Sequence, residues 1–237
     1  MTSDQRGGRG RVAATISVIG EILITLGLLL ALFVVYSLWW TNVIADRHEK
    51  AEAKKVRQQW AQSGPTGGNA APKGLDTGDG IGFLHVPAMG KHYEVLVKKG
   101  TSTKVLNEGV AGYYTKPTPS ALPWDPTGNF TLAAHRDGHG AKFHNIDKIK
   151  DGDPIVFESK DTWYVYKVYK ILDQTSKYNV AVTAQVPKES GKTKPGRYIT
   201  LTTCTPVYTS RYRYIVWGQL VRTQKVDPQR TPPAELR

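Results

Sequence analysis

The longest apolar run of the chain lies near its N-terminus. Within residues 22–40, polar side chains occur only at Thr25, Tyr36 and Ser37. A helix of this length rises about 28 Å, which with its flanks is enough to cross a hydrocarbon core of roughly 30 Å. The run ends in a tryptophan pair typical of a membrane interface, whereas a cleaved signal peptide has a shorter apolar core and a small-residue cleavage site. The pattern predicts a retained transmembrane signal anchor over residues 12–40, preceded by a short cytoplasmic terminus over residues 1–11.

The next two segments are polar and differ in character. Residues 46–62 alternate positive and negative charges at helical spacing, which predicts either a stalk that extends the membrane helix or a solvated charged helix without a partner. We favour the solvated helix. Residues 63–80 are rich in glycine and proline, the composition of a flexible linker. We therefore place a stalk and linker over residues 41–80 and expect the folded domain to begin near Ile81.

From Ile81 onward most apolar runs have the length and bounds of β-strands. These runs cover residues 82–86, 92–97, 130–135, 154–158, 163–172, 198–203 and 212–222. The first two flank a short turn and predict a hairpin, while residues 101–108 and 142–149 predict short helical segments. About seven or eight short strands with few helices predict a mainly β fold, a single antiparallel or mixed β-barrel over residues 81–222. A polar tail follows at residues 223–237.

Charge adds information about partners rather than about the fold. The chain has a formal net charge of +12. It contains no basic helix and no RNA-binding aromatic motif, so we expect no nucleic-acid partner. Its positive residues are scattered, which suits a position beside an anionic membrane or cell wall. Counting positive charges does not orient the anchor, because arginines precede the apolar run and both lysines and arginines follow it.

Cys204 is the only cysteine of the chain, so an intramolecular disulfide is impossible. The residue must be buried and inert, paired between chains, or chemically used. It ends the predicted strand 198–203, and Thr205 and Pro206 then break that strand, so we expect Cys204 at a barrel mouth where a reagent can reach it. Arg213 starts the returning strand. A strand–loop–strand return brings the two side chains to the same end of the sheet.

Five segments resemble a known family. TLTTC at residues 200–204, followed by Arg213 in RYIVWG, closely resembles the signature of sortases, and AHR at residues 134–136 resembles their histidine motif. GYY at residues 112–114, TGN at residues 127–129 and the single N-terminal anchor look most like class E, the housekeeping type of high-GC Gram-positive bacteria. The resemblance implies a closed β-barrel that cleaves a C-terminal sorting signal between Thr and Gly. It also implies that the Thr is then joined to a cell-wall amine of a peptidoglycan precursor.

The chemistry gives each residue of this constellation a role. The thiolate of Cys204 is the attacking species, and His135 and Arg213 can favour its formation. Arg213 can hold the negative charge that develops on the Thr oxygen. His135 can protonate the leaving glycine amine and recover a proton from the incoming amine. Asp137 and His139 could complete a metal cluster with His135, but no helix or strand period makes these ligands converge, so we expect neither metal nor cofactor.

Two residue assignments stay open on the sequence. Arg211 alternates with Arg213 along the predicted strand, so only the resemblance separates them. Class E relatives are associated with LAXTG rather than LPXTG sorting signals, and the resemblance implies that a tyrosine in the loop before the histidine strand reads that position. Tyr114 is the first candidate and Tyr113 the second, while simple packing of Tyr114 on the barrel is an equal alternative. Thr203 is a further candidate for contact with the substrate.

Other function classes use some of the same features. A membrane-bound cysteine hydrolase would release a free acid, and a catalytically silent wall-binding module would not need Cys204. A pilin-polymerising class C-like sortase is the nearer alternative, but a polar tail follows the domain where such an enzyme has a second membrane segment. We therefore predict a housekeeping transpeptidase that is anchored in the cell membrane, with its catalytic domain outside and secreted proteins bearing a sorting signal as substrates.

Overall fold

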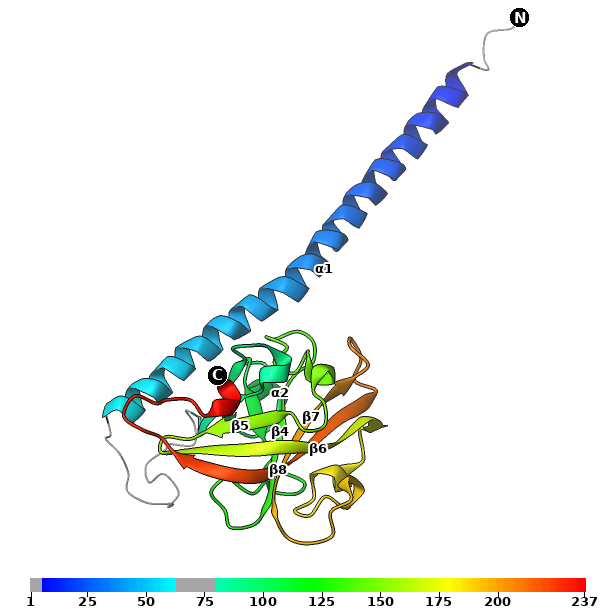
Figure 1. Cartoon of the computed structure of the whole chain (residues 1–237). Helices are drawn as coiled ribbons and strands as arrows, with labels where there is room; N and C mark the ends of the chain where they lie inside the picture. The colour runs from blue at the N-terminus through cyan, green and yellow to red at the C-terminus, as the bar shows by residue number, and fades with distance from the viewer. Residues whose placement is uncertain (1–5, 63–79) are drawn as a thin grey trace, which may run out of the picture. The chain divides into compact units, whose positions relative to one another are not determined.

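The computed structural model describes residues 6–62 and 80–237 (Figure 1). The chain divides after Thr41 into two compact units. The first unit contains the beginning of helix α1 (Arg6–Gln62), and the second contains the rest of that helix together with a β-barrel. The linker expected at residues 63–80 lies outside the described residues except for Gly80, and so do the first five residues of the expected N-terminal segment.

In the first unit, α1 carries an apolar surface with nothing packed on it. Side chains such as Leu23, Ile24 and Phe33 are 61%, 74% and 64% exposed. Within the described residues this is the one helix that is long and apolar enough to cross a membrane. The predicted N-terminal apolar helix is confirmed, whereas the bounds 12–40 of an anchor within α1 and its place in a membrane remain predictions.

The charged end of α1 packs against the barrel, so the interpretation of residues 46–62 as a solvated helix without a partner is wrong. Val56 is fully buried and Trp60 is 5% exposed. Both belong to a cluster with Phe83 and Leu96, in which the Trp60 ring meets the Phe83 ring edge-on at 5.4 Å between centroids. The buried positions 45, 49, 56 and 60 lie on one helical face, but the carboxylate at position 49 breaks the apolar stripe in the sequence.

Within the described residues eight strands close into a barrel, which confirms the predicted mainly β fold. The strand order around the barrel is β1-β2-β3-β4-β7-β8-β6-β5. Strands β2 and β3 pair in parallel, as do β4 and β7, and the other neighbours are antiparallel. The strands are β1 (Gly82–His85), β2 (Glu94–Lys99), β3 (Ala111–Tyr113), β4 (Gly128–Ala133), β5 (Pro154–Glu158), β6 (Thr162–Ser176), β7 (Arg197–Thr205) and β8 (Tyr212–Lys225).

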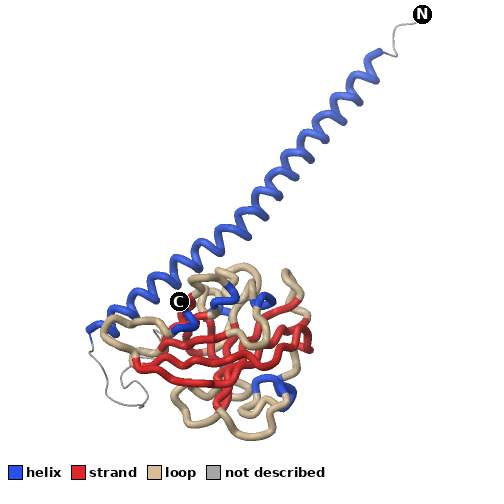
Figure 2. Tube along the Cα trace, in the orientation of Figure 1, coloured by secondary structure: helices blue, strands red, loops and turns tan. Residues whose placement is uncertain are grey.

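Short helical turns occupy connections between these strands, and one more, η5, lies in the segment after β8 (Figure 2). They are α2 (Thr103–Leu106), η1 (Pro87–Met89), η2 (Ile146–Lys148), η3 (Val180–Thr183), η4 (Lys188–Ser190) and η5 (Ala234–Leu236). Helix α2 lies inside the predicted segment and begins after Ser102, whose side chain accepts a hydrogen bond from the Val105 amide. The GYY segment was expected in a loop, but its first two residues belong to β3. A strand of three residues is too short for period-two alternation to reveal it.

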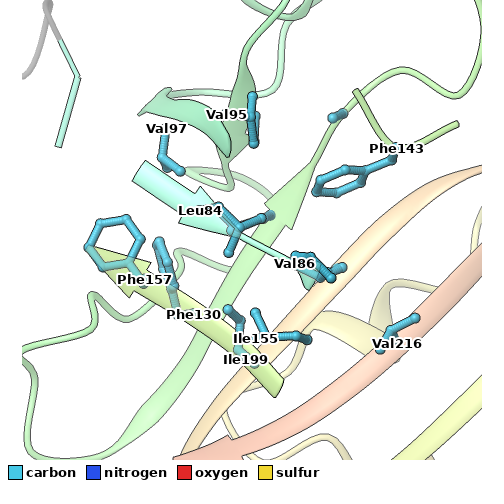
Figure 3. Packing of buried hydrophobic residues seen from close by; sticks show 14 of the residues in the cluster. Leu84, Val86, Val95, Val97, Phe130, Phe143, Ile155, Phe157, Ile199 and Val216 are labelled. Atoms are coloured by element: carbon cyan, nitrogen blue, oxygen red, sulfur yellow. The ribbon is translucent and has the colours of Figure 1, made fainter. Parts of the chain in front are cut away.

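The two faces of β7 have different environments, and this difference positions the reactive side chains. Ile199 and Leu201 belong to the main core, where Ile199 lies beside Ile155 and Phe130 (Figure 3). Because successive side chains of a strand point to opposite faces, Cys204 lies on the other face. On that outer face Trp217 of β8 packs under η3 and donates a hydrogen bond from its indole nitrogen to a backbone carbonyl of that turn at 3.1 Å.

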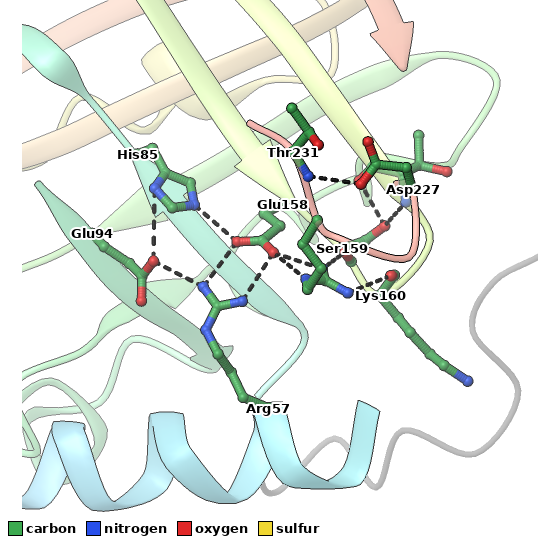
Figure 4. Close-up of polar contacts among 10 residues, drawn as sticks. Arg57, His85, Glu94, Glu158, Ser159, Lys160, Asp227 and Thr231 are labelled. Carbon is green, nitrogen blue, oxygen red and sulfur yellow. Dashed lines mark hydrogen bonds and ion pairs between the residues drawn. The ribbon is translucent and has the colours of Figure 1, made fainter. Parts of the chain in front are cut away.

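Glu158, at the end of β5, ties three parts of the second unit together (Figure 4). Arg57 of α1 donates to both carboxylate oxygens at 2.9 Å, and Arg230 of the C-terminal segment donates at 2.6 Å. Burial raises the pKa of the Glu158 carboxyl, but hydrogen bonds with His85 and Arg57 outweigh that effect and lower the pKa to about 2. Glu158 therefore stays ionised at neutral pH. Its contacts hold the end of α1 and the segment after β8 to the barrel.

Candidate active site

The register of β7 and β8 places Cys204 directly opposite Arg213. Paired residues of neighbouring strands have their side chains on the same face of the sheet. The strand–loop–strand return therefore brings the two residues to one end of the sheet, as predicted. Strand β7 continues one residue beyond Cys204, to Thr205, before the chain turns toward β8.

The register of β4 and β7 places His135 on the other side of Cys204. These strands are parallel, with Ala133 opposite Thr202, and continuing that register by two residues sets His135 beside Cys204. Two side-chain bonds hold the strands together where regular pairing ends. Thr203 donates from its hydroxyl to the Ala134 carbonyl at 2.7 Å, and Arg136 donates from its guanidinium to the Thr205 hydroxyl at 3.0 Å. By this extension of the register, His135, which lies two residues past the end of β4, falls in a row with Cys204 and Arg213.

Cys204 is half-buried and forms no disulfide. A thiol that is partly exposed at a strand end is open to attack and alkylation, unlike the inert buried cysteine that was one of the alternatives from the sequence. His135 and Arg213 are also half-buried. All three side chains are therefore partly exposed.

The imidazole of His135 is held by Asn107, which the sequence analysis did not single out. The His135 Nε2 atom and the Asn107 Oδ1 atom are 2.8 Å apart. Asn107 is the C-terminal cap of α2, and nothing in the local sequence distinguishes it from an ordinary cap. Burial lowers the pKa of His135 and the nearby His139 lowers it further, while Asp137 opposes both effects. The resting imidazole is therefore mostly neutral at pH 7 and can accept a proton.

The structure separates the two arginines that the sequence left as rivals. Arg213 lies in β8, and its guanidinium donates to the Ser210 and Tyr212 carbonyls at 3.1 and 2.9 Å. Arg211 precedes the strand, is exposed, and lies over the Tyr212 ring at 5.2 Å from its centroid. Only Arg213 is paired in register with Cys204.

The three residues named as candidates for substrate contact occupy different places. The hydroxyl of Tyr114 lies 3.0 Å from the hydroxyl of Thr202, which shares a strand face with Cys204. Burial raises the pKa of the Tyr114 phenol, and the hydrogen bond with Thr202 partly opposes that effect. Tyr113 instead belongs to the main core and is 7% exposed. Thr203 is 3% exposed, on the face opposite to Cys204, where it joins the cysteine strand to the histidine strand.

Among the described residues, the metal-ligand types that gather most closely lie elsewhere. The ligand atoms of His85, Glu94 and Glu158 are within 4.8 Å of one another. A cavity of about 270 Å³ adjoins them and is lined by none of the three residues in the row. Two guanidinium groups already neutralise Glu158, so a cation would have to displace them. The other candidate metal site is the cluster of His135, Asp137 and His139 considered from the sequence. There the Asp137 carboxylate accepts a hydrogen bond from the Tyr208 amide at 2.6 Å.

The row of a thiol, an imidazole and a guanidinium supplies the parts of nucleophilic acyl transfer. The thiol provides the nucleophile, the neutral imidazole accepts and returns a proton, and the guanidinium stabilises an oxyanion. All three are fixed by strand pairing or by the hydrogen bonds described above. The arrangement can therefore cleave an amide and pass the acyl group to a second nucleophile.

Comparison with known proteins identifies the family that this arrangement belongs to. The sortase domain matches residues 84–221. The chain is 66% identical over 239 residues to Sortase SrtE2 of Streptomyces coelicolor, and the match covers 98% of this chain and 94% of that protein. It is 46% identical over 205 residues to Sortase SrtE1 of the same organism, covering 86% of this chain and 56% of that protein.

Solved structures agree with the sequence comparison. The crystal structure of sortase E1 from Streptomyces coelicolor, which has a tripeptide in its active site, matches with a TM-score of 0.61 and 45% identity and covers 65% of this chain and 95% of that chain. Sortase E from Streptomyces avermitilis matches with a TM-score of 0.58 and 34% identity and covers 67% of this chain and 97% of that chain.

Proposed function

This chain belongs to the sortase family, as a class E sortase transpeptidase, and we propose that Cys204, His135 and Arg213 carry its reaction. The observation that supports this assignment is the row of the three residues across β4, β7 and β8. The substrate is a secreted protein with a C-terminal sorting signal of the LAXTG or LPXTG type. The acceptor is an amine of a peptidoglycan precursor.

The first half of the reaction forms a thioester. His135 takes the proton of the Cys204 thiol, and the sulfur attacks the carbonyl carbon of the signal's Thr. Negative charge develops on the carbonyl oxygen, and the always-charged guanidinium of Arg213 stabilises it. The bond between the Thr carbonyl carbon and the Gly nitrogen then breaks. The His135 imidazolium gives its proton to that nitrogen, which leaves as a free amine.

The second half transfers the acyl group to the acceptor. The incoming amine attacks the thioester carbon and gives a proton to His135, and the Cys204 sulfur leaves. A new amide forms, and the protonated imidazole of His135 returns its proton to the released Cys204 thiolate, which restores the starting state of the enzyme. Water that attacks in place of the amine releases a free acid, so hydrolysis is a leak of this pathway. Burial lowers the pKa of His135, which keeps its imidazole neutral and ready to accept the proton of the Cys204 thiol.

Tyr114 is the residue that we assign to recognition of the signal's second position. Its hydroxyl lies beside Thr202 on the face that carries Cys204. There it can accept a hydrogen bond from the backbone N–H of Ala in LAXTG, a donor that Pro in LPXTG lacks. A substrate with Pro forms one hydrogen bond fewer with the enzyme, so the bond discriminates between the two signals.

Exchanging Tyr114 for phenylalanine tests this role. The wild-type chain should cleave LAXTG peptides more efficiently than LPXTG peptides, and Tyr114→Phe should reduce the ratio of their kcat/KM values by roughly five- to tenfold, the scale of one lost hydrogen bond. The measurement is cleavage of both peptides by chromatography, with an amine present. Tyr113→Phe is the matched control, because that ring lies in the core and should leave the ratio unchanged. Equal efficiencies in the wild type, or an unchanged ratio in Tyr114→Phe, would remove the assignment.

The apolar part of α1 is, in this proposal, a membrane anchor that leaves residues after Trp40 outside the cell. A membrane-impermeant thiol reagent should therefore label Cys204 in intact cells. The chain has one cysteine, so Cys204→Ala is the control for labelling of other proteins. Protection of the barrel from protease in intact protoplasts would contradict this orientation.

A further inference from the structure

The loop that follows His135 has an unusual backbone. Gly138, His139, Gly140 and Ala141 all have positive φ, at 62°, 47°, 83° and 41°. Glycine adopts this left-handed region readily, but His139 and Ala141 are strained there. A strained loop persists only where neighbouring groups hold it. The contacts that hold this loop therefore decide where His135 sits.

Three residues of α1 contact this loop directly. Asn42 accepts a hydrogen bond at its side-chain oxygen from the Gly140 amide at 2.8 Å. One turn later, the carboxylate of Asp46 accepts a hydrogen bond from the Lys142 ammonium, also at 2.8 Å. The next turn adds Glu49, whose carboxylate lies 3.7 Å from the same ammonium and also accepts from the Leu96 amide of β2 at 3.2 Å. Successive turns of α1 thus bind the loop and strand β2.

The same part of α1 also packs closely against the turn that carries Asn107, the partner of the His135 imidazole. Ala45 is 2% exposed, and a side-chain carbon added at Gly109 would lie 2.8 Å from the Ala45 carbonyl oxygen. Gly109 has a φ of 75° and lies two residues after Asn107, the partner of the His135 ring. The absence of a side chain at Gly109 therefore lets the helix approach this turn closely.

The link from the loop back to His135 is short. The Phe143 amide, next to Lys142, donates to the His135 carbonyl at 2.9 Å. Phe143 itself is fully buried in the main core. A shift of Gly140 or Lys142 would therefore be passed to the backbone of His135 rather than absorbed by a free loop.

We propose that residues 42–49 of α1 are a positioning element of the active site, which holds the 138–143 loop and the 107–109 turn and so places the His135 imidazole against Cys204. This inference rests on the proposed catalytic role of His135. It gives the helix after the apolar segment a function in catalysis in addition to packing against the barrel. Asn42 and Asp46 act through His135 and touch no reacting atom.

The helix offers a matched control for these contacts. Asp46 pairs with Lys142 of the loop at 2.8 Å, and Glu52 pairs with Lys98 of β2 at 3.9 Å. Both pairs join a carboxylate of α1 to a lysine of the barrel. Only the first involves the 138–143 loop. Lys98 also pairs with Glu108 of the 107–109 turn at 2.7 Å, a contact that Glu52 does not make and that stays in place when Glu52 is removed.

The test compares Asn42→Ala/Asp46→Ala with Glu52→Ala in the full chain in detergent micelles. The double variant should lower kcat at least roughly tenfold with KM within about twofold, because small misplacements of a catalytic group lower the rate of chemistry. Amide hydrogen exchange of residues 138–145 should become faster in the double variant. Glu52→Ala should match the wild type in kcat and in exchange of this loop. The single variant Asp46→Asn keeps Asn42 and still offers Lys142 an acceptor, so it should retain most of the wild-type kcat.

Two results would overturn the inference. One is an unchanged kcat and unchanged loop exchange in the double variant. The other is a loss of kcat that only follows a lower melting temperature and appears equally in Glu52→Ala. A wild-type chain without transpeptidation would contradict the proposed function instead, and the exchange of residues 138–145 would still decide whether α1 holds the loop.

Discussion

Replacing Cys204 with alanine should abolish all turnover, including hydrolysis, while leaving the fold intact. The thiol provides the sulfur that carries the acyl group in both halves of the reaction, and the chain has no other cysteine to replace it. Its half-buried position on the outer face of β7 means that removal of the sulfur opens no cavity in the core. The measurement is cleavage and transfer of a sorting-signal peptide, with the melting temperature as the control for folding. Turnover by a folded Cys204→Ala chain would show that another group is the nucleophile.

Removing the side chain of His135 or Arg213 should lower turnover nearly as much as removing the Cys204 thiol. His135→Ala and Arg213→Ala should each lower kcat/KM by at least roughly two to three orders of magnitude, the scale for removal of a proton shuttle or an oxyanion donor. His139→Ala and Arg211→Ala are matched controls. The His139 ring lies 5.5 Å from that of His135, and Arg211 is two residues from Arg213 but outside β8.

Both control variants should lower kcat/KM far less than the variants that they match. Initial rates at several peptide concentrations separate kcat from KM in each variant. If Arg211 proved essential and Arg213 dispensable, the oxyanion role would pass to Arg211. If His139→Ala removed activity and His135→Ala did not, the proton shuttle would have to be reassigned in the same way.

The parts of the site that follow from strand geometry could be predicted from the sequence. The run that ends in TLTTC and the run that begins at Arg213 are long enough for their strand character to be plain. An antiparallel return between neighbouring strands leaves little freedom in register, so Cys204 and Arg213 had to meet. The parallel neighbour β4, which brings His135, did not follow from the pattern, because parallel strands are joined by long connections whose path the local sequence does not fix.

The parts that depend on tertiary contacts could not be predicted. The face of α1 that packs on the barrel is interrupted by the carboxylate at Glu49, so its residues read as a solvated helix. Glu49 is tolerated there because the Leu96 amide and Lys142 compensate the burial that raises its pKa. Asn107 likewise has no local signal, since only the folded chain brings it to His135.

The rivalry between Arg211 and Arg213 had a different cause. Both residues share a strand face if β8 is extended backward, so alternation alone could not choose between them. The strand begins at Tyr212, and Arg211 turns away to lie over the Tyr212 ring. A boundary of one residue therefore favours Arg213, and strand boundaries are the least certain part of any pattern in a sequence.

Intact-mass spectrometry of the chain during turnover is the measurement that decides the mechanism most directly. The chain is mixed with an LAXTG or LPXTG peptide, first without and then with a glycine-based amine. Without the amine, the mass should rise by that of the peptide up to its Thr acyl group, and digestion should place the addition on the fragment that contains Cys204. Adding the amine should remove the adduct and give the ligated peptide. No adduct on Cys204, or an adduct that yields only the free acid at saturating amine, would contradict thioester transpeptidation by this cysteine.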